Sequence, residues 1–153
     1  MLPQSITPTD ICIRSATEQD ASVLYEFICL LEESALDAGA FNTIFRRNLL
    51  NPDVHYLVAE RVDTILGFIS CHVQYLLHHV GKVGEIQELF VRPEVRSQGI
   101  GQKLLVALNK LAQQENFVNL EVTTNKKRLD TLRFYERELF SRTHVKLVKP
   151  IRS

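Results

Sequence analysis

The chain has 153 residues, of which 45% are apolar, and its 18 Lys and Arg residues balance its 18 Asp and Glu residues. This length predicts one domain with one continuous core. The balanced charge gives no reason to expect a nucleic acid or a membrane as partner, and no apolar run approaches the roughly 18 residues of a membrane-spanning helix.

The first ten residues, MLPQSITPTD, predict a flexible lead-in (1–10) before a domain at 11–153. They lack the basic start and apolar core of a signal peptide, so we expect a cytoplasmic protein. Cys12, Cys29 and Cys71 are odd in number and lie in apolar contexts. This favours reduced core residues over a disulfide or metal framework.

Hydrophobic periodicity predicts alternating strands and helices. The elements expected in the first half are a strand at 11–14, a helix from an N-cap at Thr17 to about Glu33, a shorter helix around Phe41–Leu49, and a hairpin of strands 54–61 and 64–75 with a bulge at Gly67. Those of the second half are a loop with Gly81 and Gly84, a strand at 85–92, a helix from near Gln102 to about Asn116, a strand at 118–123, a helix at 127–139 and a strand at 142–148. The helix before residue 118 is a crossover connection, so the strands on its two sides should be parallel. The order β-α-α-β-β-β-α-β-α-β indicates a mixed α/β domain.

The stretch GEIQELFVRPEVRSQGIGQKLL at 84–105 joins a strand to a glycine turn and a helix N-terminus. This arrangement is typical of an anion site, because glycines let the backbone approach closely and the first N–H groups of a helix face the ligand. A dinucleotide fingerprint would need a third glycine, and a P-loop would need G-x-x-x-x-G-K-[ST], which is absent from the sequence. A plain strand-to-helix turn is the alternative reading.

Arg96, Gly99 and Gly101 fill the pattern Q/R-x-x-G-x-G/A, which resembles the acetyl-CoA pyrophosphate loop of the GNAT N-acetyltransferase superfamily. The element order also resembles that fold over nearly the whole chain. The resemblance implies a mixed, mostly antiparallel sheet of six to seven strands flanked by about four helices. A second segment, RFYERELF at 133–140, is similar to the superfamily's F-Y-E-x-x-G-F, except that Leu139 replaces the usual helix-ending glycine and Thr131 a common alanine.

A closer resemblance is to the aminoalkylphosphonate N-acetyltransferases, which acetylate the amine of small aminophosphonates with help from a divalent metal. It rests on the segments ICLLE (28–32), NLLNP (48–52), VQYLLHHV (73–80), GEIQEL (84–89), TNKKR (124–128) and RFY (133–135). It implies acetyl-CoA as cosubstrate, a small-molecule amine as acceptor and a divalent metal as a further candidate. A homodimer is compatible with these features.

The resemblance assigns the CoA contacts by position. The residues expected to bind acetyl-CoA are Arg96, Ser97, Gln98, Gly99, Ile100, Gly101 and Gln102 at the pyrophosphate, Leu89, Phe90 and Val91 along the pantetheine arm, and Asn125 at its amides. Asn125 has an ordinary alternative as a turn former.

Acetyl transfer to an amine needs a base for the ammonium and an acid for the departing thiolate. The candidates are Glu85 or Glu88 as base and Tyr135 as acid. Strand alternation puts Glu85 on one face and Glu88 with Ile86 on the other unless a bulge intervenes. Each carboxylate could instead only pair with a neighbouring cation, and Tyr135 could be a core aromatic.

His78 and His79, beside these carboxylates, are candidate metal ligands that would hold a phosphonate oxygen, although loop histidines are often only solvated. The alternative phosphonate partners are Arg46, Arg47 and Lys82. We therefore expect an acetyl-CoA-dependent N-acetyltransferase acting by direct attack on a small amine, with an aminoalkylphosphonate as substrate. The alternatives are acetylation of a protein, peptide or other small amine, or a non-catalytic acyl-CoA-binding module.

Overall fold

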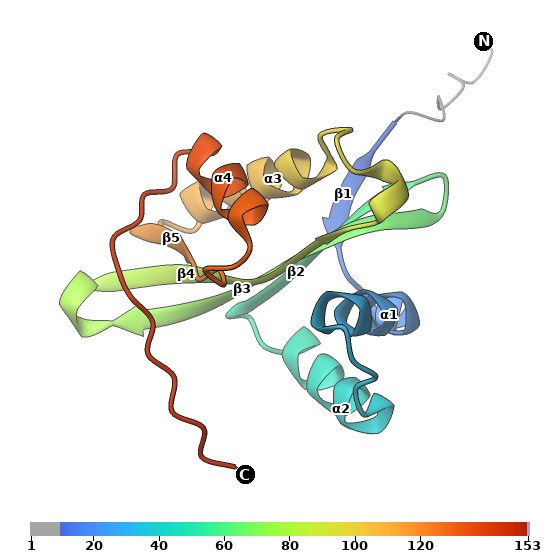
Figure 1. Cartoon of the computed structure of the whole chain (residues 1–153), viewed down its shortest axis with the longest axis horizontal. Coiled ribbons are helices and arrows are strands. Elements are labelled where there is room, and N and C mark those ends of the chain that lie inside the picture. The colour runs from blue at the N-terminus through green and yellow to red at the C-terminus, as the bar shows by residue number, and fades with distance from the viewer. Residues whose placement is uncertain (1–9, 153) are drawn as a thin grey trace.

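A computed structural model describes residues 10–152, which form a five-stranded sheet with helices on both faces (Figure 1). The strands are β1 (Cys12–Ser15), β2 (Val54–Arg61), β3 (Thr64–Leu76), β4 (Gly81–Val91) and β5 (Asn119–Val122), and the helices are α1 (Ala21–Glu32), α2 (Ala38–Leu49), α3 (Ile100–Gln114) and α4 (Leu129–Arg137). Short 3-10 turns lie at Glu18–Asp20, Leu77–His79 and Pro93–Val95. The strands follow one another in chain order across the sheet; β1 to β4 are antiparallel, and β5 is parallel to β4 as its crossover helix predicts.

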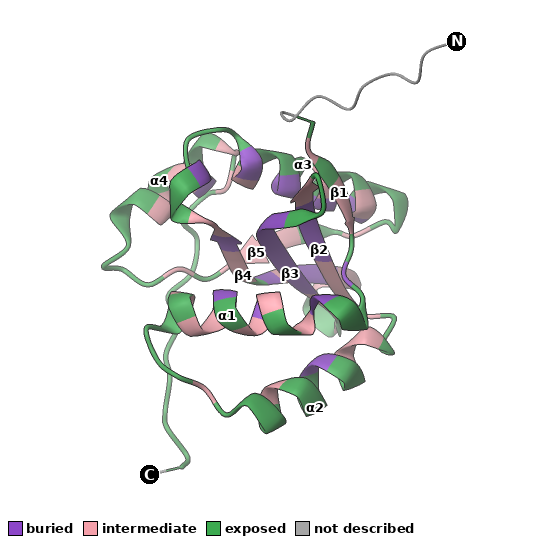
Figure 2. Ribbon diagram, turned by 90° about the vertical axis from the view of Figure 1, so that its right-hand side faces the viewer, coloured by how far each residue is buried: buried purple, intermediate pink, exposed green. Residues whose placement is uncertain are grey.

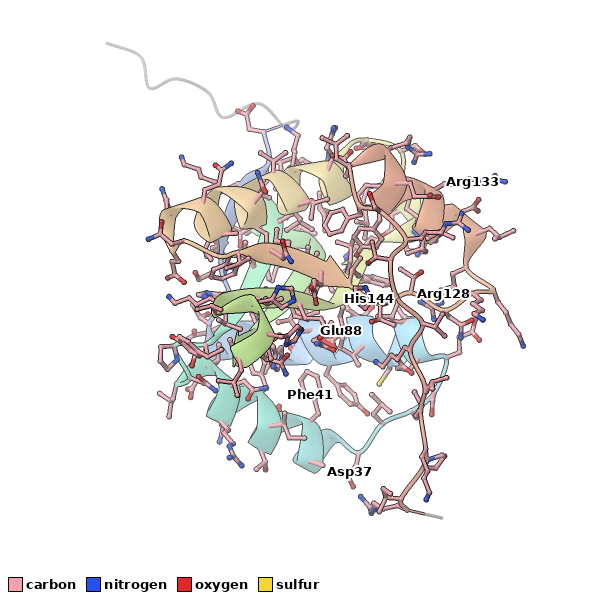
Figure 3. All side chains as sticks on the ribbon, turned by 90° about the vertical axis from the view of Figure 1, so that its left-hand side faces the viewer. Asp37, Phe41, Glu88, Arg128, Arg133 and His144 are labelled. Atoms are coloured by element: carbon pink, nitrogen blue, oxygen red, sulfur yellow. The ribbon has the colours of Figure 1, made fainter. Side chains whose placement is uncertain are left out.

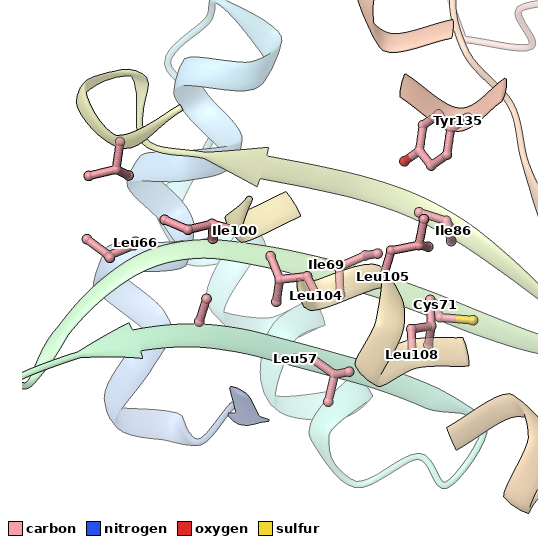
Figure 4. Packing of buried hydrophobic residues seen from close by; sticks show 12 residues of the cluster. Leu57, Leu66, Ile69, Cys71, Ile86, Ile100, Leu104, Leu105, Leu108 and Tyr135 are labelled. Carbon is pink, nitrogen blue, oxygen red and sulfur yellow. The ribbon is translucent and has the colours of Figure 1, made fainter. Parts of the chain in front are cut away.

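Helices α1 and α2 cover one face of the sheet, and α3 and α4 cover the other, which buries side chains on both sides (Figure 2). On the α3 side the core includes Ile69, Ile86, Leu104, Leu108 and Tyr135 (Figure 4). On the α1 side it includes Leu24, Phe27, Phe45, Phe68 and Phe90. The apolar stripes of the helices therefore pack as helical periodicity predicts.

Side-chain hydrogen bonds mark the starts of the 3-10 turn Glu18–Asp20 and of α2. The Asp20 carboxylate accepts from the backbone N–H of Thr17 at 2.7 Å and pairs with Arg14 at 2.8 Å, which holds its pKa below the usual range. Asp37 caps α2 by accepting from the backbone N–H of Ala40 at 2.8 Å. Among the described residues, no helix is long and apolar enough to cross a membrane.

The expected number of strands is wrong, because the sheet has five strands rather than six or seven. Residues 142–148 form no strand; they are exposed and extend beyond α4. The helix at 127–139 is confined to Leu129–Arg137, and α3 begins at Ile100 rather than near Gln102.

Gly81 and Gly84 lie in β4 and not in the predicted loop. Glycine is needed at both positions, because neighbouring side chains leave no room for a Cβ atom. A Cβ atom on Gly84 would lie 2.6 Å from the Phe117 ring, and one on Gly81 would lie 2.7 Å from Val118. The bulge expected at Gly67 lies next to it, where Ala59 pairs with Gly67 and Glu60 with Ile65.

Candidate active site

Beyond the end of β5, one edge of β4 has no described strand beside it, which leaves an opening in the sheet between β4 and β5. β5 pairs with β4 only from Val83 to Ile86, whereas β4 continues to Val91 with β3 as its single described neighbour. The edge of residues 87–91 that faces away from β3 therefore has backbone groups available to a ligand. The predicted pantetheine segment, Leu89 to Val91, lies on this edge.

The glycine loop follows β4 and leads directly into α3. Ser97 and Gly99 have positive φ angles of 69° and 78°, and Gly99 has open space where a Cβ would stand. The first α3 hydrogen bond across this boundary runs from Lys103 N–H to the Gly99 carbonyl at 3.0 Å. The N–H groups of residues 100–102 come before it and are the donors that a helix start leaves for an anion.

Arg96 folds back along the end of β4. Its Nε donates to the Val91 carbonyl at 3.1 Å, and its guanidinium lies 6.0 Å from the centre of the Phe90 ring. The positive charge therefore stays at the junction of β4 and the loop. Gln98 lies further out, where its Oε1 accepts from Arg61 at 3.4 Å.

A β-bulge reorganises the carboxylates of β4. Ser70 pairs with Glu88 and Cys71 with Ile86, so Gln87 is the extra residue. Directly opposed residues share a face, and Glu85, opposite His72, therefore lies on the same face as Glu88. The predicted separation of Glu85 and Glu88 held only in the absence of a bulge, and this bulge brings them onto one face.

Ser70 fixes the side chain of Glu88. The fully buried Ser70 hydroxyl donates to Glu88 Oε1 at 2.6 Å and accepts from the Glu88 backbone N–H at 3.0 Å. One carboxylate oxygen is thus anchored, and the orientation of Glu88 is set by a rigid part of the sheet.

A pocket of about 420 Å³ lies between the sheet and helices α1 and α2. Its lining comprises Ile28, Phe41, Ile44, Phe45, Asn48, Tyr56, Phe68, His72, Gln87 and Glu88. Figure 3 shows Glu88 on the sheet and Phe41 on α2, on the two sides of this space. Glu85 is not among the lining residues, so of the two predicted bases only Glu88 reaches the pocket.

Sequence reasoning missed the other polar residues of the pocket. Asn48 Nδ2 donates to the Tyr56 hydroxyl at 2.7 Å, and the rings of Tyr56 and His72 lie 6.4 Å apart. Burial, with a smaller contribution from the charge of Glu88, raises the pKa of Tyr56, so its phenol stays neutral. The only signal for them in the sequence was the hairpin expected from strands 54–61 and 64–75. Its pairing could have placed Tyr56 and His72 on the same face of the sheet.

No described Lys or Arg lines the pocket, which makes Glu88 its dominant charge. Arg128 lies nearby, in the loop before α4, where its Nη2 donates to the Leu31 carbonyl at 3.2 Å. Leu31 follows the pocket residue Ile28 by one helical turn. The pocket interior therefore suits an ammonium group, and a cation is available beside the end of α1.

Tyr135 lies on the opposite face of the sheet from Glu88. It is 3% exposed and packs edge-on against Phe134 and Phe140, with ring centres 5.2 and 5.3 Å away. Burial raises the pKa of its phenol, which therefore keeps its proton at neutral pH. Both alternatives foreseen for Tyr135 are compatible with this position, since a core aromatic can also carry an acidic proton.

The remaining predicted ligands are more scattered. His78 is exposed, and His79 Nε2 lies 3.8 Å from Glu121 Oε2. Across residues 10–152, no group of three or more His, Cys, Asp or Glu side chains is placed to hold a metal ion. The residues present thus do not form a metal centre by themselves, and the metal stays a prediction.

Four further candidates lie outside the pocket lining. Lys82 lies 5.9 Å from the Tyr75 ring centre, and Arg46 and Arg47 are exposed on α2 outside the pocket lining. Asn125 accepts from the backbone N–H of Lys127 at 2.9 Å through its Oδ1, as a turn former does. Its contact with CoA amides stays a prediction for the side-chain N–H groups.

Comparisons with known proteins show which sequences the chain resembles. Residues 21–139 match the model of the Acetyltransferase (GNAT) family. The chain is 42% identical to the aminoalkylphosphonate N-acetyltransferase of Salmonella typhimurium over 139 residues, which are 91% of this chain and 90% of that protein. An uncharacterized N-acetyltransferase of Archaeoglobus fulgidus is 36% identical over 52% of this chain and 54% of its own length.

Solved structures share the fold at low identity. A transcriptional regulator from Bacillus halodurans superposes with a TM-score of 0.86 at 23% identity, covering 93% of this chain and all of its own. The aminoglycoside N-acetyltransferase AAC(6')-Iy, solved in complex with CoA, superposes with a TM-score of 0.84 at 13% identity over 100% of both chains. At these identities the likeness shows the fold alone.

Proposed function

The chain belongs to the acetyltransferase (GNAT) family, and we propose that it transfers the acetyl group of acetyl-CoA to the primary amine of a small aminoalkylphosphonate. The reaction type rests on the family. The substrate class rests on the Salmonella relative and on a pocket whose interior charge is the Glu88 carboxylate.

The cosubstrate binds along the α3 side of the opening. The N–H groups at the start of α3 hold the pyrophosphate, and the unpaired edge of β4 at residues 87–91 pairs with the pantetheine arm. A backbone N–H on that edge polarises the thioester carbonyl. The acceptor enters from the opposite side of the sheet, through the pocket beside α2.

Glu88 takes a proton from the ammonium of the bound acceptor, directly or through water. The free amine nitrogen attacks the thioester carbonyl carbon, and the new C–N bond replaces the C–S bond. Tyr135 donates its proton to the departing thiolate, and the second proton that the nitrogen loses on becoming an amide returns through solvent to the Tyr135 phenolate. Tyr135 and Glu88 lie on opposite faces of the sheet. Tyr135 therefore acts on the thiolate from the α3 side, and Glu88 acts on the amine from the pocket beside α2.

Direct attack is favoured over an acetyl-cysteine intermediate. Cys71 is fully buried on the α3 side, and burial, followed by the charge of Glu85, raises the pKa of its thiol to about 12. A thiol held neutral in this way is a poor nucleophile.

The single observation that carries the assignment of the site is the position of Glu88, which lines the pocket and is held there by the Ser70 hydroxyl. A pocket of about 420 Å³ beneath α1 and α2 also favours a small acceptor over a protein chain.

The test is CoA thiol release with a matched panel of acceptors: an aminoalkylphosphonate, the corresponding aminocarboxylate and the corresponding uncharged amine. We expect the highest kcat/KM for the aminophosphonate. Equal values for all three would overturn the substrate assignment, and no thiol release with any amine would favour a non-catalytic module. Parallel assays with EDTA and with added divalent ions test the predicted metal, since a chelation-insensitive rate would exclude a required ion.

A further inference from the structure

The pocket beside α2 is larger than a small aminoalkylphosphonate requires. Its volume is about 420 Å³, which lies within the range of roughly 300–1,000 Å³ that holds drug-sized ligands. A short aminoalkylphosphonate is much smaller than such a ligand and leaves part of this space unfilled. The side chains around the remaining space therefore indicate which other acceptors fit.

The polar residues of the lining gather around Tyr56. Its hydroxyl accepts from Asn48 Nδ2 at 2.7 Å, and its ring lies 6.4 Å from that of His72. Burial, followed by the charge of Glu88, raises the pKa of Tyr56, which places this carboxylate near the same group. The lining side chains without a polar atom are Ile28, Phe41, Ile44, Phe45 and Phe68. An ammonium at Glu88 therefore has a large apolar region beside it.

Three rings of the lining form an aromatic wall, which consists of Phe41, Phe45 and Tyr56. Phe41 and Phe45 are stacked with ring centres 5.9 Å apart, and Phe45 and Tyr56 are stacked with centres 5.6 Å apart. The wall runs from Tyr56 on β2 to Phe41 in the first turn of α2, across the pocket from Glu88 (Figure 3). A further ring packs well against such a wall, because aromatic pairs in offset or edge-on contact attract each other beyond their area burial.

The pocket is accessible to an uncharged ring. Ile44 lines the pocket and is 58% exposed, so the space opens to solvent on the α2 side. Phe45 is 4% exposed and closes the pocket toward the core. No described Lys or Arg lines the pocket, so an acceptor body without negative charge leaves no buried cation unpaired.

We propose that the protein also acetylates arylalkylamines, in which a short alkyl chain joins a primary amine to an uncharged aromatic ring. The ammonium lies at Glu88, and the ring lies against the aromatic wall. This inference rests on the proposed acetyl transfer at Glu88 but does not require a phosphonate.

The chemical step is the same for this acceptor. Glu88 takes one proton from the ammonium and later releases it to solvent. The nitrogen attacks the thioester carbonyl carbon, and a C–N bond replaces the C–S bond. The thiolate takes the proton of Tyr135, and the second proton of the nitrogen returns through solvent to Tyr135. The products are an N-acetylated arylalkylamine, CoA thiol and one proton.

Initial rates of CoA thiol release with 2-phenylethylamine and 2-methoxyethylamine test the preference for a ring. The amine of 2-methoxyethylamine is at least as acidic, so a larger fraction of free amine cannot explain a faster reaction of 2-phenylethylamine. We expect kcat/KM to be about tenfold or more higher for 2-phenylethylamine, with its N-acetyl product identified by mass spectrometry. Equal values would overturn the proposal.

Two variants locate the ring in the pocket. Phe41→Ala removes the outer ring of the aromatic wall, and Ile44→Asn puts an amide at an exposed part of the lining; each should lower the ratio of the two kcat/KM values several-fold. Leu50→Asn is the matched control for Ile44→Asn, because Leu50 directly follows α2 and is 88% exposed but lies outside the lining. Because Ile44 is exposed, Ile44→Asn decides the outcome even if Phe41→Ala does not fold.

A ratio that stays unchanged in Ile44→Asn and in folded Phe41→Ala would overturn the proposal. Thiol release with an aminoalkylphosphonate but no preference for the ring would overturn this inference alone. Absence of thiol release with every amine would overturn the proposed function as well.

Discussion

Glu88→Gln removes the proposed base while it leaves the geometry of the site in place. Glutamine is the same size as glutamate, and its side-chain oxygen can still accept from the Ser70 hydroxyl, which lies 2.6 Å from Glu88 Oε1 in the native protein. The backbone hydrogen bond from residue 88 to Ser70 is unaffected. We therefore expect the free energy of unfolding to change by less than about 1 kcal/mol.

The loss should appear in the chemistry. Positioned acid–base groups contribute roughly 10²- to 10⁴-fold to a rate. At about 1.4 kcal/mol per factor of ten, this corresponds to about 3 to 5 kcal/mol of transition-state stabilisation. Initial rates of CoA thiol release give kcat/KM, while calorimetric titration with CoA and thermal unfolding show whether binding and stability persist.

Glu85→Gln is the matched control, because Glu85 lies on the same strand and face, opposite His72, but outside the pocket lining. Its kcat/KM should stay within a few-fold of the native value. The reasoning is refuted if Glu85→Gln loses activity while Glu88→Gln keeps it, since a place in the pocket lining would then not identify the base.

Four other predictions follow from particular contacts. Tyr135→Phe should lower kcat by about 10²-fold or more with little change in CoA affinity; an unchanged kcat would leave Tyr135 as a core aromatic only. Arg128→Gln should raise KM about tenfold for an aminoalkylphosphonate but not for the uncharged amine, and an equal change for both would exclude a contact with the phosphonate. Leu139→Gly should raise the free energy of unfolding by about 1 kcal/mol, because Leu139 has a left-handed φ of 72°, which glycine adopts without strain, and its side chain is 92% exposed. Leu139→Ala should give no such gain, and equal melting temperatures for the two variants would contradict this. Burial holds the Cys71 thiol neutral, so its contribution to stability should be complete below pH 9.0 and lost as the pH rises toward about 12; urea unfolding should show a smaller alkaline loss in Cys71→Ala, and identical losses would contradict the shift.

Elements specified by local sequence were predictable. The apolar pattern after the glycine turn predicted a helix with one buried face, and α3 buries Leu104, Leu105 and Leu108. Gly99, just before α3, has a left-handed backbone, which glycine adopts without strain. Leu139 stands where a helix-ending glycine is usual, and it adopts the left-handed conformation of such a glycine, with a φ of 72°. Its N–H bonds to the Glu136 carbonyl and that of Phe140 to the Tyr135 carbonyl, which closes α4 in a Schellman motif without glycine.

Features that depend on pairing between distant strands were not predictable. Strand alternation separated Glu85 from Glu88, and only the register of β3 against β4 shows the bulge that unites them. Ser70 carried no signal as a site residue because a serine on a strand is ordinary until its partner is known. Residues 142–148 alternate as a strand should, but a strand also needs a neighbouring edge, which a pattern within one segment cannot supply.

The central claim is that Glu88 deprotonates an amine held in the pocket beside α2, so that this amine receives the acetyl group directly. The most direct test is mass spectrometry of all components after incubation of the protein with acetyl-CoA and an aminoalkylphosphonate. The account predicts one N-acetylated aminoalkylphosphonate for each CoA released and no acetyl group on the protein, with product formation lost in Glu88→Gln. CoA release without acetylated acceptor, an acetylated protein intermediate, or undiminished product from Glu88→Gln would contradict it.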